Sequence, residues 1–239
     1  MALNWKSPLF INYNRLRTCI MIWLKKIIRK TFLYQLKLRL DGIKRDRSRQ
    51  KENALILKDW NLKGRPVPSP QVIKRRIIKE YASRYKIKSF IESGTYMGDT
   101  VEDCKRIFKK IASIELDPSL YQGAKKRFEN DNHITIYKGD SGEIIGLIMK
   151  EVSEPCLFWL DGHYSEGITA KGNLNTPILD ELTHILHHRI KTHVILIDDA
   201  RCFNGLDDYP SIDTLREIVK KVDNNLRFEI ADDIIRISE

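Results

Sequence analysis

The sequence has 239 residues, of which 42% are hydrophobic and 31% charged, a composition that excludes a disordered chain. Its four cysteines lie far apart and form no C-x-x-C pair, which excludes a zinc knuckle or a disulfide framework and favours a reducing compartment, the cytoplasm. The net charge of +10 comes from residues 1–60, which hold 15 Lys or Arg and 4 Asp or Glu. Because the rest of the chain is almost neutral, nucleic acid is not an expected partner.

The sequence predicts two parts, a basic helical arm with its linker over residues 1–60 and a folded domain over 61–239. Residues 41–52 contain almost no apolar side chains and are predicted to be a linker. Three prolines between residues 66 and 70 then indicate an extended entry to the domain.

Residues 16–40 are predicted to form a basic amphipathic helix, because apolar residues recur there at steps of three and four with Lys and Arg between them. The longest apolar run, 19–24, is far shorter than the ~20 residues that span a bilayer. Two interpretations are open. The helix docks on the domain or on a second copy in a homo-oligomer, or it lies on an anionic membrane surface as a peripheral contact.

Beyond residue 70 the hydrophobic pattern alternates between helical and strand periods. Helices are predicted over residues 71–85, 100–111, 118–129, 141–152, 176–189 and 211–222. The second of them is predicted to start with a capping box, Thr100-Val-Glu-Asp103. Strands are predicted over residues 88–94, 111–115, 134–137, 156–160, 194–197, 227–231 and 234–237. Apolar strands that alternate with helices indicate an α/β fold: a doubly wound, mostly parallel seven-stranded sheet that closes with an antiparallel C-terminal hairpin.

Each of the first five predicted strands is followed by at least one carboxylate. In chain order these are Glu92, Glu115, Asp140, Asp161 and the pair Asp198–Asp199. A single acid such as Asp140 has an equally good interpretation as a helix cap, but five together are hard to explain in that way. Since sheets of this kind bind ligands at the carboxyl ends of their strands, these acids are candidate site residues.

The first two strand ends indicate a nucleoside site. Gly94 and Gly98 allow the backbone to approach a ligand closely, and Glu115 ends the next strand, where a carboxylate can bind ribose hydroxyls. The G-x-x-x-G loop lacks the dinucleotide fingerprint, and no phosphate-binding G-x-x-x-x-G-K-[ST] follows it. NAD and ATP are therefore disfavoured.

Over residues 86–239 the sequence resembles the class I S-adenosylmethionine-dependent methyltransferases. The resemblance rests on FIESGTYMGDT (90–100), SIELDP (113–118), KGDS (138–141) and the C-terminal hairpin. It implies a Rossmann-like fold, an enzyme that transfers methyl groups, and S-adenosylmethionine as the cofactor. The cofactor contacts that it implies are Glu92, Gly94, Thr95, Gly98, Glu115, Asp140 and Ser141.

The later segments FWLDGHYSEG (158–167), TPILDEL (176–182) and VILIDDAR (194–201) resemble a bacterial branch similar to the metal-dependent sugar and catechol O-methyltransferases. That resemblance implies a divalent ion held by Asp161, Asp198 and Asp199. The chemistry of the residues agrees, because three carboxylates are hard oxygen ligands that suit Mg²⁺. A bound metal ion would lower the pKa of an acceptor hydroxyl.

Asp161 and His163 are the predicted catalytic residues, with His163 as the candidate base. An equally good interpretation is that His163 only orders its loop. The catechol branch has a lysine three residues beyond its first metal acid, where this sequence has Tyr164. The histidines at 184, 187 and 188 have metal-like spacings, but a solvated helical face explains them better.

The function expected from these features is S-adenosylmethionine-dependent O-methylation of a small polyhydroxylated acceptor such as a sugar, assisted by a divalent metal ion. Two alternatives are open. One is a metal-dependent hydroxylase or hydrolase that uses the same acids. The other is a non-catalytic protein that the basic arm tethers to a membrane or an RNA.

Overall fold

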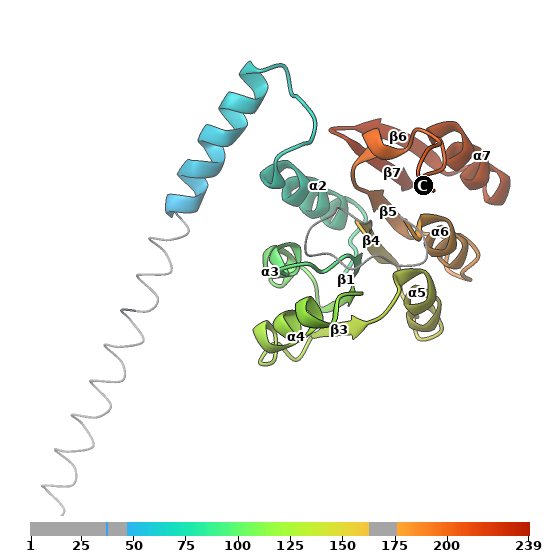
Figure 1. Cartoon of the computed structure of the whole chain (residues 1–239), viewed down its shortest axis with the longest axis horizontal. Coiled ribbons are helices and arrows are strands. Elements are labelled where there is room, and N and C mark those ends of the chain that lie inside the picture. Colours follow the sequence, from blue (N-terminus) through green and yellow to red (C-terminus); the bar gives the residue numbers. More distant parts are fainter. Residues whose placement is uncertain (1–36, 38–46, 163–175) are drawn as a thin grey trace, which may run out of the picture. The chain divides into compact units, whose positions relative to one another are not determined.

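The computed structural model describes residues 37, 47–162 and 176–239 (Figure 1). Contacts divide the chain into two compact units, residues 1–56 and residues 57–239. The basic helix predicted over residues 16–40 lies outside the described residues except for Lys37. Among the residues that are described, no helix is both long enough and apolar enough to cross a membrane.

Residues 47–62 form a helix, so the prediction of a linker over residues 41–52 is wrong for its second half. This segment contains no Gly or Pro, and its Arg, Gln, Lys and Glu side chains favour a helix although they are polar. Near the end of the helix the indole of Trp60 is buried, and its Nε1 donates a hydrogen bond to the carbonyl oxygen of Pro66 at 2.8 Å.

Residues 57–239 contain the predicted seven-stranded sheet, in the order β3-β2-β1-β4-β5-β7-β6. The strands are β1 (Ser89–Ser93), β2 (Lys110–Glu115), β3 (Ile134–Lys138), β4 (Cys156–Leu160), β5 (Val194–Ile197), β6 (Arg227–Ala231) and β7 (Ile234–Ser238). The first five are parallel, and β7 pairs antiparallel with both β5 and β6. The α/β fold, its parallel centre and its antiparallel closing hairpin are thereby confirmed.

Helices cover both faces of the sheet (Figure 1). They are α2 (Gln71–Arg84), α3 (Asp99–Cys104), α4 (Pro118–Arg127), α5 (Ser141–Met149), α6 (Ile178–Leu186) and α7 (Ile212–Val222), with a 3₁₀ turn at Ala200–Cys202. Along β4, Phe158 and Leu160 pack in the core that α5, α6 and α7 share, whereas Trp159 packs in the core of α2 and α3. A strand with both faces buried explains the unbroken apolar run.

Helices α3 and α6 differ most from the predicted ranges, while α4 and α5 end two and three residues earlier than predicted. Helix α3 begins at Asp99 and ends at Cys104, so the prediction of a helix over 100–111 that starts with a capping box at Thr100 is wrong. Its N-cap is Gly98, whose φ of +80° is a backbone conformation that favours glycine. Helix α6 is shorter than the predicted 176–189, because Pro177 precedes its first residue and the chain leaves the helix after Leu186.

Candidate functional site

The predicted acids gather at the carboxyl-terminal ends of the parallel strands β1 to β5, which all lie at the same end of the sheet. The registers place Ser93 of β1 opposite Ile114 of β2 and Leu160 of β4. Leu160 in turn lies opposite Ile197 of β5. The residues that directly follow these positions therefore share one rim, and the loops that carry them surround its centre.

The glycine loop after β1 is held against both neighbouring strands. Gly94 and Thr95 donate backbone hydrogen bonds to the carbonyl oxygen of Ile114 at 3.0 and 3.1 Å. Gly94 has a φ of +83°, and a Cβ atom at this position would lie 2.5 Å from the carbonyl oxygen of Asp161. The approach of the loop to the end of β4 therefore requires glycine here.

The carboxylate of Glu115 lies against this loop. Its Oε2 accepts a hydrogen bond from the backbone N–H of Tyr96 at 2.7 Å, and its Oε1 accepts one from the N–H of Asp117 at 2.9 Å. Burial raises the pKa of Glu115 above its usual value, and these two N–H groups oppose the shift. Each oxygen retains acceptor capacity, so the group can still bind hydroxyls.

Glu92 is buried beneath the loop and is 1% exposed. Ser113 donates a hydrogen bond to its Oε2 at 2.5 Å, and the hydroxyls of Ser113 and Thr95 are 2.6 Å apart. Burial raises the pKa of Glu92 to about 8, although the hydrogen bond from Ser113 favours the ionised form. Glu92 and Ser113 thus form a buried polar floor that the hydroxyl of Thr95 contacts from the glycine loop.

Two of the strand-end acids are helix caps. Asp117 accepts hydrogen bonds from the N–H groups of Ser119 and Leu120 at the start of α4, at 2.7 and 2.9 Å. Asp140 accepts one from the N–H of Gly142 at the start of α5, at 2.8 Å. The capping interpretation is correct for both residues. A cap uses one carboxylate oxygen, so the predicted cofactor contact of Asp140 stays a prediction.

Two of the three acids predicted to bind metal, Asp198 and Asp199, lie beside the ammonium of Lys74, which comes from the first turn of α2. The Lys74 ammonium forms a short ion pair with Asp198 Oδ2, and it lies 3.9 Å from Asp199 Oδ1. Burial disfavours the charged lysine, but the attraction of Asp198, with further contributions from Asp161 and Asp199, raises the pKa of Lys74.

This arrangement does not fit a divalent ion. Within residues 47–162 and 176–239, no group of three or more His, Cys, Asp or Glu side chains is arranged so that it could hold a metal ion. Asp198 Oδ1 accepts the N–H of Asp199 at 2.9 Å, and its Oδ2 contacts Lys74. The difference from Glu115 is that one of the two donors to Asp198 is a cation, which a metal ion would have to displace.

Arg201 completes the ionic cluster. Its Nη1 donates to Asp199 Oδ1 at 2.7 Å and forms a shorter contact with Asp233 in the turn of the C-terminal hairpin. Asp199 itself has a φ of +54°, a left-handed conformation that is uncommon outside glycine. Arg201 therefore fixes an unusual turn after β5, a role that the sequence did not reveal.

A small hollow opens beside Asp161 and Asp198, at the ends of β4 and β5. Its lining includes Tyr209, Thr176 and the carboxyl of Glu181. Glu181 is 1% exposed, and its Oε1 has no hydrogen-bond partner among the described residues. Burial raises the pKa of Glu181 to about 7, although the hydroxyls of Ser141 and Ser93 oppose the shift.

Lys74 and Glu181 are the two site residues that sequence reasoning missed. Lys74 precedes the first strand and lies 124 positions from its partner Asp198, so no local pattern connects them. Glu181 stands in the TPILDEL segment three residues after Ile178 and four before Ile185, which places a carboxyl group on the apolar face of the helix. That position is the signal in the sequence, and the fold adds that the buried carboxyl lies near the ends of the strands.

The other predicted site residues have mixed outcomes. Ser141 is buried at the start of α5, next to Glu181. His163, the candidate base, lies outside the described residues. His184 and His187 are exposed, and His188 is half-buried with its Nδ1 3.0 Å from Nε2 of His193. This pair lies at the opposite end of the strands, where β4 and β5 begin.

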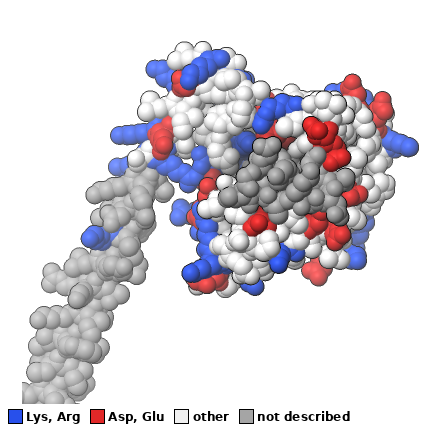
Figure 2. All heavy atoms as spheres, viewed as in Figure 1, with Lys and Arg blue, Asp and Glu red and all other residues white. Residues whose placement is uncertain are grey.

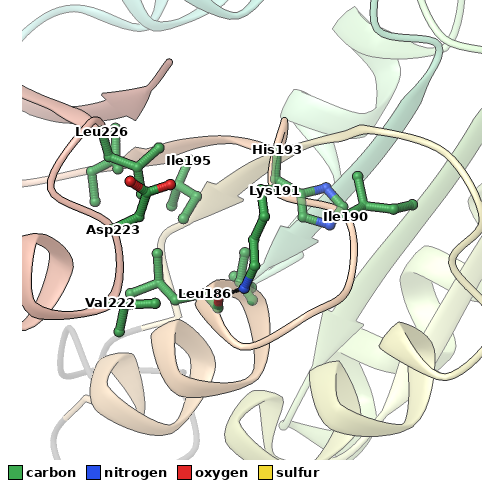
Figure 3. Close-up of a pocket in the computed structure, with 10 residues that line it drawn as sticks. Leu186, Ile190, Lys191, His193, Ile195, Val222, Asp223 and Leu226 are labelled. Atoms are coloured by element: carbon green, nitrogen blue, oxygen red, sulfur yellow. Dashed lines mark hydrogen bonds between the residues drawn. The ribbon is translucent and has the colours of Figure 1, made fainter.

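His193 is the buried member of that pair, and it adjoins a second small pocket that Ile195, Leu226 and Lys191 help to line (Figure 3). Its Nδ1 accepts the backbone N–H of Cys156 at 3.0 Å, so this nitrogen carries no proton. Burial lowers the pKa of His193 to about 4, and the neighbouring charges of His188 and Lys191 act in the same direction.

We expect acid to destabilise the domain through His193. Below the unfolded pKa of about 6.5 only the unfolded chain gains this proton, so stability falls as pH drops towards the folded pKa of about 4. The contribution lost between pH 8 and pH 5 is about 2 kcal/mol. Urea unfolding of His193→Asn, which keeps an acceptor for Cys156, should show a correspondingly smaller loss. The exposed His184→Asn is the control, and an identical loss in all three proteins would contradict the assignment.

No protein-family model matches the sequence, and no curated protein matches it. Solved structures do match. An O-methyltransferase from Bacillus cereus in complex with SAH is 11% identical, with a TM-score of 0.51 over 78% of this chain and 90% of that chain. The O-methyltransferase TomG from Streptomyces achromogenes, in complex with SAM, is 12% identical, with a TM-score of 0.49 over 77% and 87%. At such low identity the first of these supports the fold alone. Together with the strand order, it identifies the class I methyltransferase fold.

Proposed function

We propose that the chain is an S-adenosylmethionine-dependent methyltransferase that methylates an oxygen atom of a small polyhydroxylated acceptor such as a sugar. The observation that carries the proposal is the buried carboxylate of Glu115, held against the glycine loop by the N–H of Tyr96. In this fold a carboxylate at the end of the second strand is placed to accept two ribose hydroxyls.

The residues around the glycine loop fit the cofactor. The tight approach of Gly94 to Asp161 leaves the loop backbone free of side-chain bulk at the rim, and Glu115 supplies the acceptor oxygens beside it. Glu92 and Ser113 support the loop from below through Thr95, and we assign Gly98, Asp140 and Ser141 to the rest of the cofactor site. When bound, S-adenosylmethionine supplies a methyl group activated by its sulfonium charge.

The acceptor is assigned to the ends of β4 and β5. Asp161 and Asp198 line the hollow there, and carboxylates at such a rim can orient hydroxyl groups. Around the grey atoms, basic and acidic side chains are interspersed on the face in view (Figure 2), so the described residues there form no continuous basic surface of the kind that binds nucleic acid. The sugar class itself rests on the sequence resemblance. Proton removal by His163, with Asp161 beside it, stays a prediction.

Assistance by Mg²⁺ is the part of the sequence prediction that the site supports least, because Lys74 contacts the predicted ligand Asp198. No step is therefore assigned to a metal ion. The same contact weighs against a metal-dependent hydroxylase or hydrolase built on these acids. A non-catalytic tethering role for the basic arm concerns residues that lie largely outside the described part of the chain.

The proposal is tested by transfer of a labelled methyl group. The purified chain, incubated with S-adenosylmethionine carrying a tritiated methyl group and a panel of sugars and nucleotide sugars, should release labelled acceptor and S-adenosylhomocysteine in equal amounts. Catechols and RNA in parallel reactions test the other acceptor classes. Labelled catechol or RNA without labelled sugar would overturn the acceptor class while retaining the enzyme class.

A further inference from the structure

We propose that the ammonium group of Lys74 takes the place of a divalent cation at the ends of β4 and β5, so that methyl transfer by this chain is independent of metal ions. The inference rests on the proposed function for its catalytic meaning. Its structural part is that the ammonium of Lys74, on α2, occupies the cation position, and this part can be tested without measuring a reaction.

The position of Lys74 is fixed by the packing of its helix. Ile73, Ile77 and Ile78 of α2 are all buried against the sheet. Lys74 stands between them, so its stem runs along the sheet surface and its side chain is only 15% exposed. An aliphatic stem on an apolar surface with its charge at the rim is a favourable arrangement for lysine.

The ammonium lies among the same carboxylates that a metal ion would use. It pairs with Asp198, whose side chain is 0% exposed, and it is 3.9 Å from Asp199, whose side chain is 12% exposed. Asp161 contributes to the same favourable field. Burial raises the pKa of Asp198 and so disfavours its charged form, and the ammonium in direct contact with it opposes that shift.

A divalent ion and the ammonium of Lys74 compete for the same carboxylate of Asp198. Mg²⁺ would have to lie about 2.1 Å from a carboxylate oxygen of Asp198, and Lys74 already contacts one of those oxygens. Its double positive charge would also repel the ammonium at close range. Binding of a metal ion at this oxygen would therefore require the Lys74 side chain to move away from Asp198. The buried pair of Asp198 with the ammonium would then be replaced by a pair of Asp198 with the metal ion.

The cation has a defined task at this rim. Asp198 lies directly after β5 and Asp161 directly after β4, so the two carboxylates would repel each other beside the acceptor hollow. Lys74 relieves that repulsion and fixes the side chain of Asp198, while Arg201 fixes Asp199. In the proposed reaction Lys74 is a positioning residue, since it fixes the buried Asp198 beside the acceptor hollow without contacting the acceptor.

The test uses Mn²⁺ as the probe and the full chain after treatment with a chelator. Titration followed by the electron paramagnetic resonance of free Mn²⁺ should detect no site tighter than about 1 mM in the wild type. In Lys74→Met, which keeps the stem and removes the charge, one site should appear that binds at least about tenfold more tightly. Adding Asp198→Asn to this variant should abolish the new site. Lys79→Met, at an exposed position of the same helix, should behave as the wild type.

The inference would be overturned if each wild-type chain bound one Mn²⁺ ion with a micromolar dissociation constant and Lys74→Met bound it equally well. It would also be overturned if Lys74→Met folded but gained no Mn²⁺ site. Should Lys74→Met fail to fold, the wild-type titration still decides, because a tight site there contradicts a resident lysine. Calorimetry with S-adenosylmethionine on the same samples separates the two proposals. A wild-type chain that does not bind S-adenosylmethionine would refute the proposed function, whereas the Mn²⁺ results concern Lys74 alone.

Discussion

Glu115→Ala should weaken S-adenosylmethionine binding by about 10- to 100-fold. The variant removes a carboxylate that would accept two ribose hydroxyls, and charge-assisted hydrogen bonds of this kind contribute about 1.5–3 kcal/mol. It also leaves the N–H groups of Tyr96 and Asp117 without their acceptor, so the loop loses its support on that side. Isothermal titration calorimetry measures the affinity directly.

Two controls make the Glu115 result specific. Glu115→Gln keeps the size and one acceptor oxygen but not the charge, and should lose less affinity than the alanine variant. Glu129→Ala makes the same exchange at an exposed position and should leave affinity unchanged. If a folded Glu115→Ala protein bound the cofactor as tightly as the wild type, the assignment of the ribose to the end of β2 would be wrong.

Gly94→Ala should reduce cofactor affinity by more than tenfold and destabilise the domain by about 1–3 kcal/mol. A methyl group on Gly94 would lie 2.5 Å from the backbone oxygen of Asp161, so either the glycine loop or the end of β4 must move. The φ of +83° adds strain for any residue with a Cβ atom. Thermal unfolding and calorimetry measure the two effects separately.

Gly64→Ala is the matched control for Gly94→Ala. Gly64 has a similar φ of +78°, but a Cβ atom there would meet no other atom within 4 Å. The backbone strain is therefore shared by the two variants and the steric clash is not. If Gly64→Ala and Gly94→Ala lowered stability equally and both retained cofactor affinity, the close approach of the loop to β4 would have no role in the site.

The fold was predictable because its signals are local. Apolar runs such as residues 156–160 mark strands buried on both faces, and the acids that follow them mark the rim of a parallel sheet. The glycine loop and Glu115 were predictable for the same reason. The side chains that contact these acids were not predictable, because Lys74 reaches Asp198 only through the packing of α2 on the sheet.

The helix start at Gly98 shows a second limit of sequence reasoning. The capping-box pattern at Thr100 is favourable by itself, but the chain must first turn at the glycine loop. The left-handed conformation of Gly98 then lets the helix begin at Asp99, one residue before the predicted start. The buried carboxyl of Glu181 is a third case. Helical periodicity places it on the apolar face of α6, but only the packing of α6 against α5 shows that this face brings it to the strand rim.

The central claim, that the rim of β1 and β2 binds S-adenosylmethionine, is tested most directly by calorimetric titration of the full chain with this cofactor. The account predicts one bound molecule per chain, with a dissociation constant in the range of about 1–100 μM, and a matching rise in the thermal unfolding midpoint. Absence of both binding heat and thermal stabilisation at about 1 mM S-adenosylmethionine would contradict it.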